Sequence, residues 1–262
     1  MGEPARKIDV IDARPDFLQA DADALNARFE GVHASAMLKA LFEEGNLGEI
    51  AVVSSFGTES AVLLHLVAKA DPTIPVTFVD TLKMFPETLE YRDTLVRTLG
   101  IKNANIVQPD PTVLAAKDEN GLRWSFDPDG CCDIRKVEPL TRAKSGLNSW
   151  ISGRKAFQSV TRQNLPRFEV EDGRLKINPL GDWVKDDLEA YFEEHDLPRH
   201  PLEEQGYLSV GCAPCTSKVK PGEDPRAGRW RGWDKTECGI HEDVTPLPVA
   251  DSDADGANDP IF

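Results

Sequence analysis

Five cysteines are the residues of this chain best suited to chemistry. Cys131 and Cys132 are adjacent, Cys212 and Cys215 form a CxxC pair, and Cys238 stands alone. An odd number of cysteines in a reducing compartment does not indicate a disulfide framework, so metal binding, redox catalysis and simple burial are the explanations to compare. Burial explains a single cysteine well, but it explains two close pairs badly.

The two cysteine pairs together could supply four thiolates to a metal site. Zinc and an iron–sulfur cluster both accept such a ligand set. The spacing of Cys212 and Cys215 lets both sulfur atoms reach one site, whereas the side chains of Cys131 and Cys132 diverge in regular structure. A cluster, whose iron atoms are separated, accommodates that divergence better than one zinc ion does. A thioredoxin-like redox role for the CxxC pair is an alternative, although it leaves the adjacent pair unexplained.

Cys238 is a candidate nucleophile. Nearby cations lower the pKa of a thiol and increase its thiolate fraction. Gly239 is expected to leave the sulfur atom accessible, while the negative charge of Glu237 opposes thiolate formation. The local sequence therefore fits a reactive nucleophile and a passive thiol about equally. The cations in question are the three arginines just upstream, Arg226, Arg229 and Arg231.

Cationic side chains are concentrated between positions 135 and 167, where the local charge is +7 because Glu138 is the only acid. A charge cluster is usually a solvated face. Here, however, Arg154 and Lys155 follow Gly153 at the end of a predicted strand, where α/β sheets bind ligands. We therefore expect a local anion site in a chain whose net charge is −15. The eight cations are Arg135, Lys136, Arg142, Lys144, Arg154, Lys155, Arg162 and Arg167.

The elements that must position these residues alternate between strands and helices. Residues 17–29 and 36–42 have the apolar spacing of two helices. Helical patterns also follow the first two predicted strands, at 61–70 and 86–99. This alternation is typical of an α/β fold with a mostly parallel sheet flanked by helices. The strands are predicted from short apolar runs at 50–53, 76–79, 104–107 and 149–152.

The loop at residues 54–60 connects the first predicted strand to its helix. Its backbone N–H groups and the helix N-terminus could hold a phosphate or sulfate, although the Gly-Lys-Ser/Thr ending of a Walker A loop is missing. Further along, residues 168–170 and 175–177 flank a Gly-containing turn and predict a β-hairpin. Asp182 is expected to cap a helix that ends near Pro198.

Length and charge limit the class of protein. The 262 residues suffice for one large domain, and no clear linker divides them, so we expect a single α/β domain over 1–241 with a mobile segment at about 216–241. Residues 242–262 hold six acids and no basic residue, which predicts a disordered acidic tail. The net charge argues against binding to nucleic acid or an anionic membrane surface. No stretch is apolar over the length of a membrane span, and no secretory signal is present, so we expect a cytoplasmic protein.

Several motifs occur in a fixed order along most of the chain. They are the loop at 54–60, CCDIRKVEPL at 131–140, WISGRK at 150–155, GCAPC at 211–215 and KTECGIH at 235–241. Together they resemble the assimilatory adenylyl-sulfate and phosphoadenylyl-sulfate reductases, and this resemblance implies a fold related to the adenine-nucleotide α-hydrolases (PP-loop proteins). In that family, two cysteine pairs mark the branch with a [4Fe–4S] cluster, which reduces adenylyl sulfate (APS). The branch without the cluster typically uses the 3′-phosphorylated substrate (PAPS).

The resemblance implies that the protein acts in sulfate assimilation and cysteine biosynthesis. It also implies roles for individual residues. Cys238, in a catalytic segment at 216–241, would attack the sulfate group, expel AMP and form an S-sulfocysteine. Thioredoxin, or a glutaredoxin-like reductant, would then release sulfite. The cluster, acting through structure and charge, would be held by Cys131, Cys132, Cys212 and Cys215. The substrate would be bound by Ser54, Ser55, Phe56, Gly57, Lys136, Arg154, Lys155, Arg226, Arg229 and His241.

Two positions depart from the family's pattern. Leu82 stands where a glycine usually follows Asp80 and Thr81, so we expect a reshaped loop. Lys155 stands where a second arginine is common, which replaces a bidentate fork by a point charge. Three other functions are alternatives: reduction of PAPS or of both substrates, an ATP-using PP-loop protein without redox chemistry, and a zinc-stabilised binding module.

Overall fold

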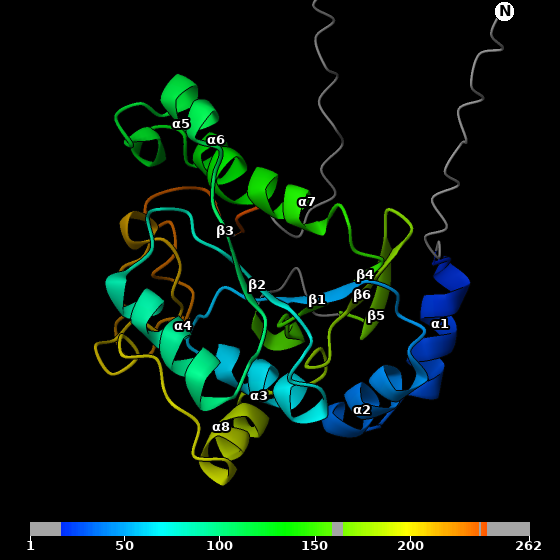
Figure 1. The fold of residues 1–262 in the computed structure, drawn as a ribbon. Helices are drawn as coiled ribbons and strands as arrows, with labels where there is room; N and C mark the ends of the chain where they lie inside the picture. Colours follow the sequence, from blue (N-terminus) through cyan, green and yellow to red (C-terminus); the bar gives the residue numbers. More distant parts are fainter. Residues whose placement is uncertain (1–16, 159–164, 236, 240–262) are drawn as a thin grey trace, which may run out of the picture.

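The computed structural model describes residues 17–158, 165–235 and 237–239, and these contain a six-stranded sheet of order β3–β2–β1–β4–β6–β5 (Figure 1). The predicted mostly parallel sheet is confirmed, including the hairpin, because only β5 runs antiparallel to its neighbour among these strands. The strands are β1 (Ile50–Val53), β2 (Val76–Val79), β3 (Ala104–Val107), β4 (Ser149–Ser152), β5 (Phe168–Glu171) and β6 (Arg174–Ile177).

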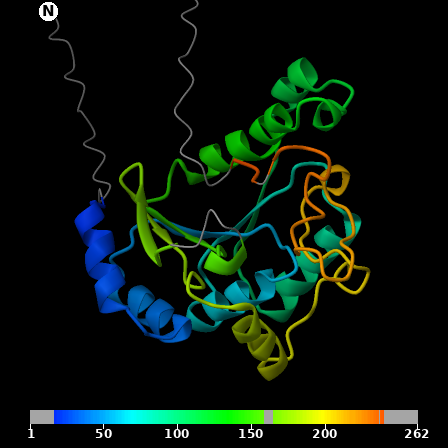
Figure 2. The ribbon, with the colours of Figure 1, turned by 180° about the vertical axis from the view of Figure 1, so that it is seen from behind.

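Helices cover both faces of the sheet. Right-handed crossovers that progress in one direction along a sheet put their helices on one face, so α3 (Ser60–Ala70) and α4 (Pro86–Thr98) lie on the same side (Figure 1). The chain then returns from β3 to β4 over the opposite face, which carries α5 (Pro111–Lys117), α6 (Pro128–Cys132) and α7 (Glu138–Lys144). Figure 2 shows the same two layers from behind. The strand order therefore reverses between β1 and β4, and such a point is where α/β sheets bind ligands.

The other helices complete the layer on the α3 side. The two N-terminal helices that the sequence predicts are α1 (Gln19–Arg28), which packs beside β5, and α2 (Ala34–Glu44), which packs on α3. α8 (Lys185–Glu194) also contacts α3. Because helices cover the sheet on both faces, β1 and β4 are apolar on both sides, and Val52 and Ile151 are 0% exposed.

Residues 111–144 form three short helices that the sequence analysis missed. α6 continues into α7 through a π-helical turn at Asp133–Val137, so the adjacent cysteines and Lys136 lie along one helical path. α5 and α6 each begin with a proline, at a position where the absent N–H has no helical partner to lose. The helices were missed because each is short and buries few side chains, which leaves no readable apolar period.

The prediction that Asp182 caps α8 is wrong. The helix begins at Lys185, and the Asp187 carboxylate accepts a hydrogen bond from the backbone N–H of Val184 at 2.9 Å. Asp182 instead forms an ion pair with Arg167 at 2.9 Å. Asp182 and Asp187 both lie near the start of the helix. The local sequence could not show that Arg167, 15 residues away, pairs with Asp182.

Some expectations concern parts of the chain that lie outside the described residues. The acidic segment 242–262 is among them, and the division into a domain and a tail remains a prediction. Within the ranges that are described, no helix has both the length and the apolar character needed to cross a membrane.

The loop after β2 contains a strained residue. Leu82 has a φ of 60°, its side chain is 49% exposed, and its N–H donates to the Asp80 carboxylate at 2.9 Å. This is the left-handed conformation that a glycine adopts without steric cost. Leu82 therefore has a backbone conformation that favours glycine, and the reshaping of this loop relative to the family remains a prediction.

We expect Leu82→Gly to raise the free energy of unfolding by about 0.5–1 kcal/mol, because it removes left-handed strain and little buried surface. Denaturant unfolding measures the change. Leu122→Gly is the matched control, since Leu122 is 55% exposed but has a φ of −110°. Glycine there should lower stability, and an equal loss in both variants would contradict the strain at Leu82.

Candidate active site

A cavity of about 330 Å³ lies at the carboxyl edge of the sheet, where the strand order reverses. The loop after β1 and the loop after β4 form two of its walls, and the π-helical turn and the C-terminal part of the described chain form others. Most of the predicted site residues meet here: the cavity is lined by Ser54, Ser55, Gly57, Lys136, Arg154, Lys155, Arg226, Arg229 and Cys238.

Two predicted substrate-binding residues are not placed in this cavity. The Phe56 side chain is 1% exposed and packs edge-to-face on Phe78, with ring centroids 5.4 Å apart. Its backbone N–H donates to Ser54 Oγ at 3.2 Å. Phe56 is therefore a core residue, and any contact with a ligand remains a prediction. His241 lies outside the described residues.

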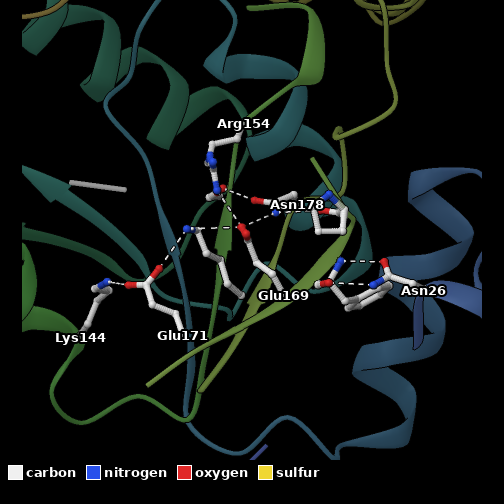
Figure 3. A network of polar contacts seen from close by, with 10 residues as sticks. Asn26, Lys144, Arg154, Glu169, Glu171 and Asn178 are labelled. Atoms are coloured by element: carbon white, nitrogen blue, oxygen red, sulfur yellow. Dashed lines mark hydrogen bonds and ion pairs between the residues drawn. The ribbon is translucent and has the colours of Figure 1, made fainter. Parts of the chain in front are cut away.

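Most of the cationic stretch is neutralised by ion pairs within the chain. Arg154 pairs with Glu169 at 2.7 Å, and Lys155 donates to Glu59 at 2.9 Å. In Figure 3, Arg154 and Asn178 converge on Glu169, while Lys144 reaches Glu171. A ligand therefore does not meet the full local charge of +7, because acidic side chains neutralise most of it. The other cations of the stretch that form ion pairs are Arg135, Arg142, Lys144 and Arg167.

Lys136 and Arg229 are half-buried cations between the main cavity and a smaller one, and they line both. Among the residues that the structure describes, Lys136 Nζ has no hydrogen bond or ion pair, and Arg229 Nε is a buried donor without an acceptor. The Arg229 guanidinium stacks 4.4 Å from the centroid of the Trp230 ring and fills the space beside Gly211, where a Cβ would lie 2.3 Å from Nη2. Withdrawing a cation from water without a counter-charge is costly, so this geometry fits an anion on either side.

The smaller cavity is enclosed by thiols. Cys131 and Cys132 come from the end of α6, and Cys212 and Cys215 flank the short 3-10 turn at Ala213–Cys215. The loop after β2 holds this turn in place. Thr81 Oγ1 lies 3.2 Å from Cys212 Sγ, and the Ala213 N–H donates to the Lys83 carbonyl at 2.8 Å.

Burial raises the pKa of Cys131 to about 11 and that of Cys132 to about 12, and it also raises the pKa of Cys215. For Lys136, burial alone lowers the pKa, but the adjacent Cys212 and Cys238 outweigh it and raise the pKa. Thiols of this kind lose their protons when a metal compensates the charge. Four thiols beside two half-buried cations are therefore a donor set suited to an anionic, thiolate-ligated group.

No group of three or more Cys, His, Asp or Glu side chains in the described part of the chain is placed to hold one metal ion. The four thiols instead surround a cavity. Both thiols of the adjacent pair interact with Cys212, and Cys132 also packs with Cys238. This arrangement around a cavity fits the separated metal atoms of a cluster better than a single ion.

Cys238 is buried against the thiol group. It is 9% exposed and packs with Cys132, Cys215 and Trp230. The expectation that Gly239 leaves the sulfur accessible is therefore wrong for this conformation. Gly239 has a φ of 80°, and a Cβ on it would lie 3.5 Å from Val137, so the segment turns in toward the π-helical turn.

The three upstream arginines do not act alike. Arg226 pairs with Glu237 at 3.2 Å, and Arg231 pairs with Glu223 at 2.9 Å. Of the three, Arg229 lies among the cysteines, and Cys238 is the thiol that interacts with its charge most strongly. Glu237, which the sequence analysis weighed only as an opposing charge, is in fact part of an ion pair.

Sequence reasoning missed a buried ion pair that supports the thiol-bearing helix. Arg135 Nη2 lies 2.6 Å from Asp118, with side chains 6% and 2% exposed, and Arg135 Nη1 donates to the Thr81 carbonyl at 2.9 Å. Burial alone raises the pKa of Asp118, but the Arg123 backbone N–H and the Arg135 guanidinium outweigh it and lower the pKa. Arg135 stood out as part of the cationic stretch, yet no sequence signal connected it to Asp118.

We expect Asp118→Asn to lower the free energy of unfolding by about 3–5 kcal/mol, because it leaves Arg135 buried without a counter-charge. Glu138→Gln is the control, since its ion pair with Arg142 is about half exposed, and its loss should cost at most about 0.5 kcal/mol. Denaturant unfolding compares the two variants. Equal effects would show that the Asp118 pair does not support the fold in this way.

The chain belongs to the phosphoadenosine phosphosulfate reductase domain family, which matches residues 49–218. It is 45% identical over 249 residues to an adenosine 5′-phosphosulfate reductase of Mesorhizobium japonicum, with 95% of this chain and 97% of that protein covered. It is 40% identical over 198 residues to a phosphoadenosine 5′-phosphosulfate reductase of Gloeobacter violaceus, covering 74% and 82%. The structure of a phosphoadenylyl-sulfate reductase from Candida auris aligns with a TM-score of 0.65 at 27% identity, covering 78% of this chain and 98% of that one. The resemblance and the fold it implied are thereby confirmed.

Proposed function

We propose that this protein reduces APS to sulfite and AMP in sulfate assimilation, with Cys238 as the nucleophile. The observation that carries the proposal is the position of Cys238 on the wall of the ligand cavity, which the half-buried cations Lys136 and Arg229 also line. The curated relatives at 45% and 47% identity are both named adenosine 5′-phosphosulfate reductase. This places the protein among oxidoreductases that act on a sulfur group.

The loops after β1 and β4 contribute Ser54, Ser55 and Gly57, and Arg154 and Lys155, to the cavity wall. The backbone N–H groups of the loop after β1 would hold the phosphosulfate end of the substrate. The phosphosulfate points to Lys136, Arg226 and Arg229. Because Arg154 and Lys155 are neutralised by Glu169 and Glu59, the strongest field for an anion is that of Lys136 and Arg229.

The chemical step is a displacement at sulfur. The Cys238 thiolate forms a bond to the sulfate sulfur while the bond from that sulfur to the bridging oxygen breaks, and AMP leaves with the electron pair. Lys136 and Arg229 stabilise the negative charge that develops on the leaving phosphate. The product on the enzyme is an S-sulfocysteine at Cys238, and no electrons have yet been supplied from outside.

A dithiol reductant completes the reaction. One of its thiolates attacks the Cys238 sulfur, sulfite leaves, and a mixed disulfide forms; the second thiol then resolves this disulfide and regenerates Cys238. Thioredoxin, or a glutaredoxin-like protein, fits this two-electron role and is kept reduced in the cytoplasm, where we place the reaction. Since Cys238 is 9% exposed, the catalytic segment 216–241 must move before a protein thiol can reach it.

The thiols suit a [4Fe–4S] cluster with Cys131, Cys132, Cys212 and Cys215 as ligands. When bound there, the cluster supplies negative charge next to Lys136 and ties α6 to the CxxC turn. Lys136 is thereby held between this charge and the substrate's phosphosulfate, which positions its ammonium at the leaving group. No electron transfer is assigned to the cluster.

Cys238→Ser tests the nucleophile. It should lower sulfite release from APS by at least about 1,000-fold, because the hydroxyl is a far weaker nucleophile than a thiolate. AMP binding, measured by calorimetry, should stay close to the wild-type value and shows that the cavity is intact. Substantial turnover by this variant would rule out Cys238.

Iron and acid-labile sulfide analysis of anaerobically purified protein tests the cluster. We expect about four iron atoms per chain with a broad visible absorption, and loss of both in Cys212→Ser. A colourless protein with stoichiometric zinc and no sulfide would contradict the cluster. That result would instead support the zinc-stabilised module considered from the sequence.

PAPS reduction is the second candidate, favoured by the Gloeobacter violaceus relative named for that substrate. The ratio of kcat/KM for the two substrates separates the candidates, and a preference for PAPS would overturn the choice of APS. An ATP-using function without redox chemistry would instead leave Cys238→Ser fully active.

A further inference from the structure

An ion pair connects the segment that carries Cys238 to α6, the helix that carries Cys131 and Cys132. Lys235 forms an ion pair with Asp129, and its Nζ also lies 5.7 Å from the centroid of the Trp230 ring. The Lys235 side chain is 9% exposed, whereas that of Asp129 is 79% exposed. Burying an ammonium is costly unless it is paired, so the Asp129 carboxylate is what makes this position of Lys235 favourable.

The two residues of this ion pair come from the thiol-bearing helix α6 and from the segment that carries Cys238. Asp129 lies on α6, the helix that carries Cys131 and Cys132. Lys235 precedes Cys238 by three residues. Neither residue lines the main cavity or the thiol cavity, so their contact acts on the position of Cys238 from outside both.

A second ion pair holds the same segment from the cavity side. Glu237, next to Cys238, pairs with Arg226 at 3.2 Å, and both residues line the main cavity. The Cys238 segment is thus bracketed by one contact that a bound substrate can influence and by one, through Asp129, that it cannot touch. The Lys235–Asp129 ion pair is therefore the contact that can be changed without altering the ligand site.

We propose that Lys235 is a positioning residue that, through its ion pair with Asp129, latches the Cys238 thiol beside Cys132, Lys136 and Arg229. The consequence for catalysis rests on the proposed function, because the latch holds the thiol where the phosphosulfate is expected. The latch itself is a property of the protein without substrate. Breaking it lets the Cys238 segment open more often, which exposes the thiol and removes it from the cavity wall.

Alkylation of Cys238 by iodoacetamide, followed by peptide mass spectrometry on the full chain, measures this opening. Asp129→Asn and Lys235→Met should each increase the alkylation rate of Cys238 about fivefold, as expected for loss of one partly exposed ion pair from a local opening equilibrium. Lys235→Arg should keep the wild-type rate, because it preserves the charge. The double variant should match the single variants, since all three lack the same contact.

A catalytic readout separates positioning from general loosening. Single-turnover release of AMP from APS without reductant should be slower in Asp129→Asn and Lys235→Met, while AMP affinity should stay unchanged because neither residue lines the cavity. Asp133→Asn is the matched control: Asp133 lies just beyond α6, is exposed, and has no ion pair with another described residue.

Two results would overturn the latch. One is an unchanged alkylation rate of Cys238 in both variants, and the other is an equal increase in Asp133→Asn. If the wild-type protein released no AMP from APS, the proposed function would fail, whereas the alkylation rates would still decide whether Lys235 holds the segment. Asp129→Asn changes an exposed side chain, so the test does not depend on the folding of Lys235→Met.

Discussion

Lys136 and Arg229 are half-buried and have no acidic partner in the described part of the chain, and the architecture of the site follows from the need to supply a counter-charge. The thiol-lined cavity lies on one side of these cations and the ligand cavity on the other. The proposed anionic metal–thiolate group would balance them from the first side, and the proposed phosphosulfate would balance them from the second. Cys238, packed on Cys132 between the two cavities, lies where its thiolate shares the same field. The π-helical turn and the buried Arg135–Asp118 pair keep Lys136 at this position.

Net charge gave a misleading first impression of this chemistry. A net charge of −15 argues against binding of an anion. The local charge of +7 at 135–167 argues for it. In the structure, six of those eight cations belong to ion pairs, and Arg162 lies outside the described residues. The anion site depends on Lys136 from that stretch together with Arg229 from another, because these half-buried cations have no acidic partner among the described residues.

The sequence predicted the strands of this fold well and the helices between β3 and β4 poorly. β1, β2, β3 and β4 match the predicted runs, because each short run is bounded by polar loops. Burial on both faces explains the apolar character of β1, whereas β3 is a largely exposed edge strand. α5, α6 and α7 each bury few side chains, so they leave no period to read. Ordered motifs brought together most residues of the site, including all five cysteines. Their partners could not be predicted: Glu169 for Arg154, Glu59 for Lys155 and Asp118 for Arg135 are distant in sequence and carry no local signature.

The central claim is that Cys238 takes the sulfonate group directly from the substrate held by Lys136 and Arg229. The most direct measurement is the intact and peptide mass of the protein after mixing with APS in the absence of any reductant. The account predicts the mass of one added SO₃ group on the peptide that carries Cys238, released as sulfite when a dithiol is added. An unmodified Cys238 in protein that still converts APS to AMP and sulfite once the dithiol is present would contradict it.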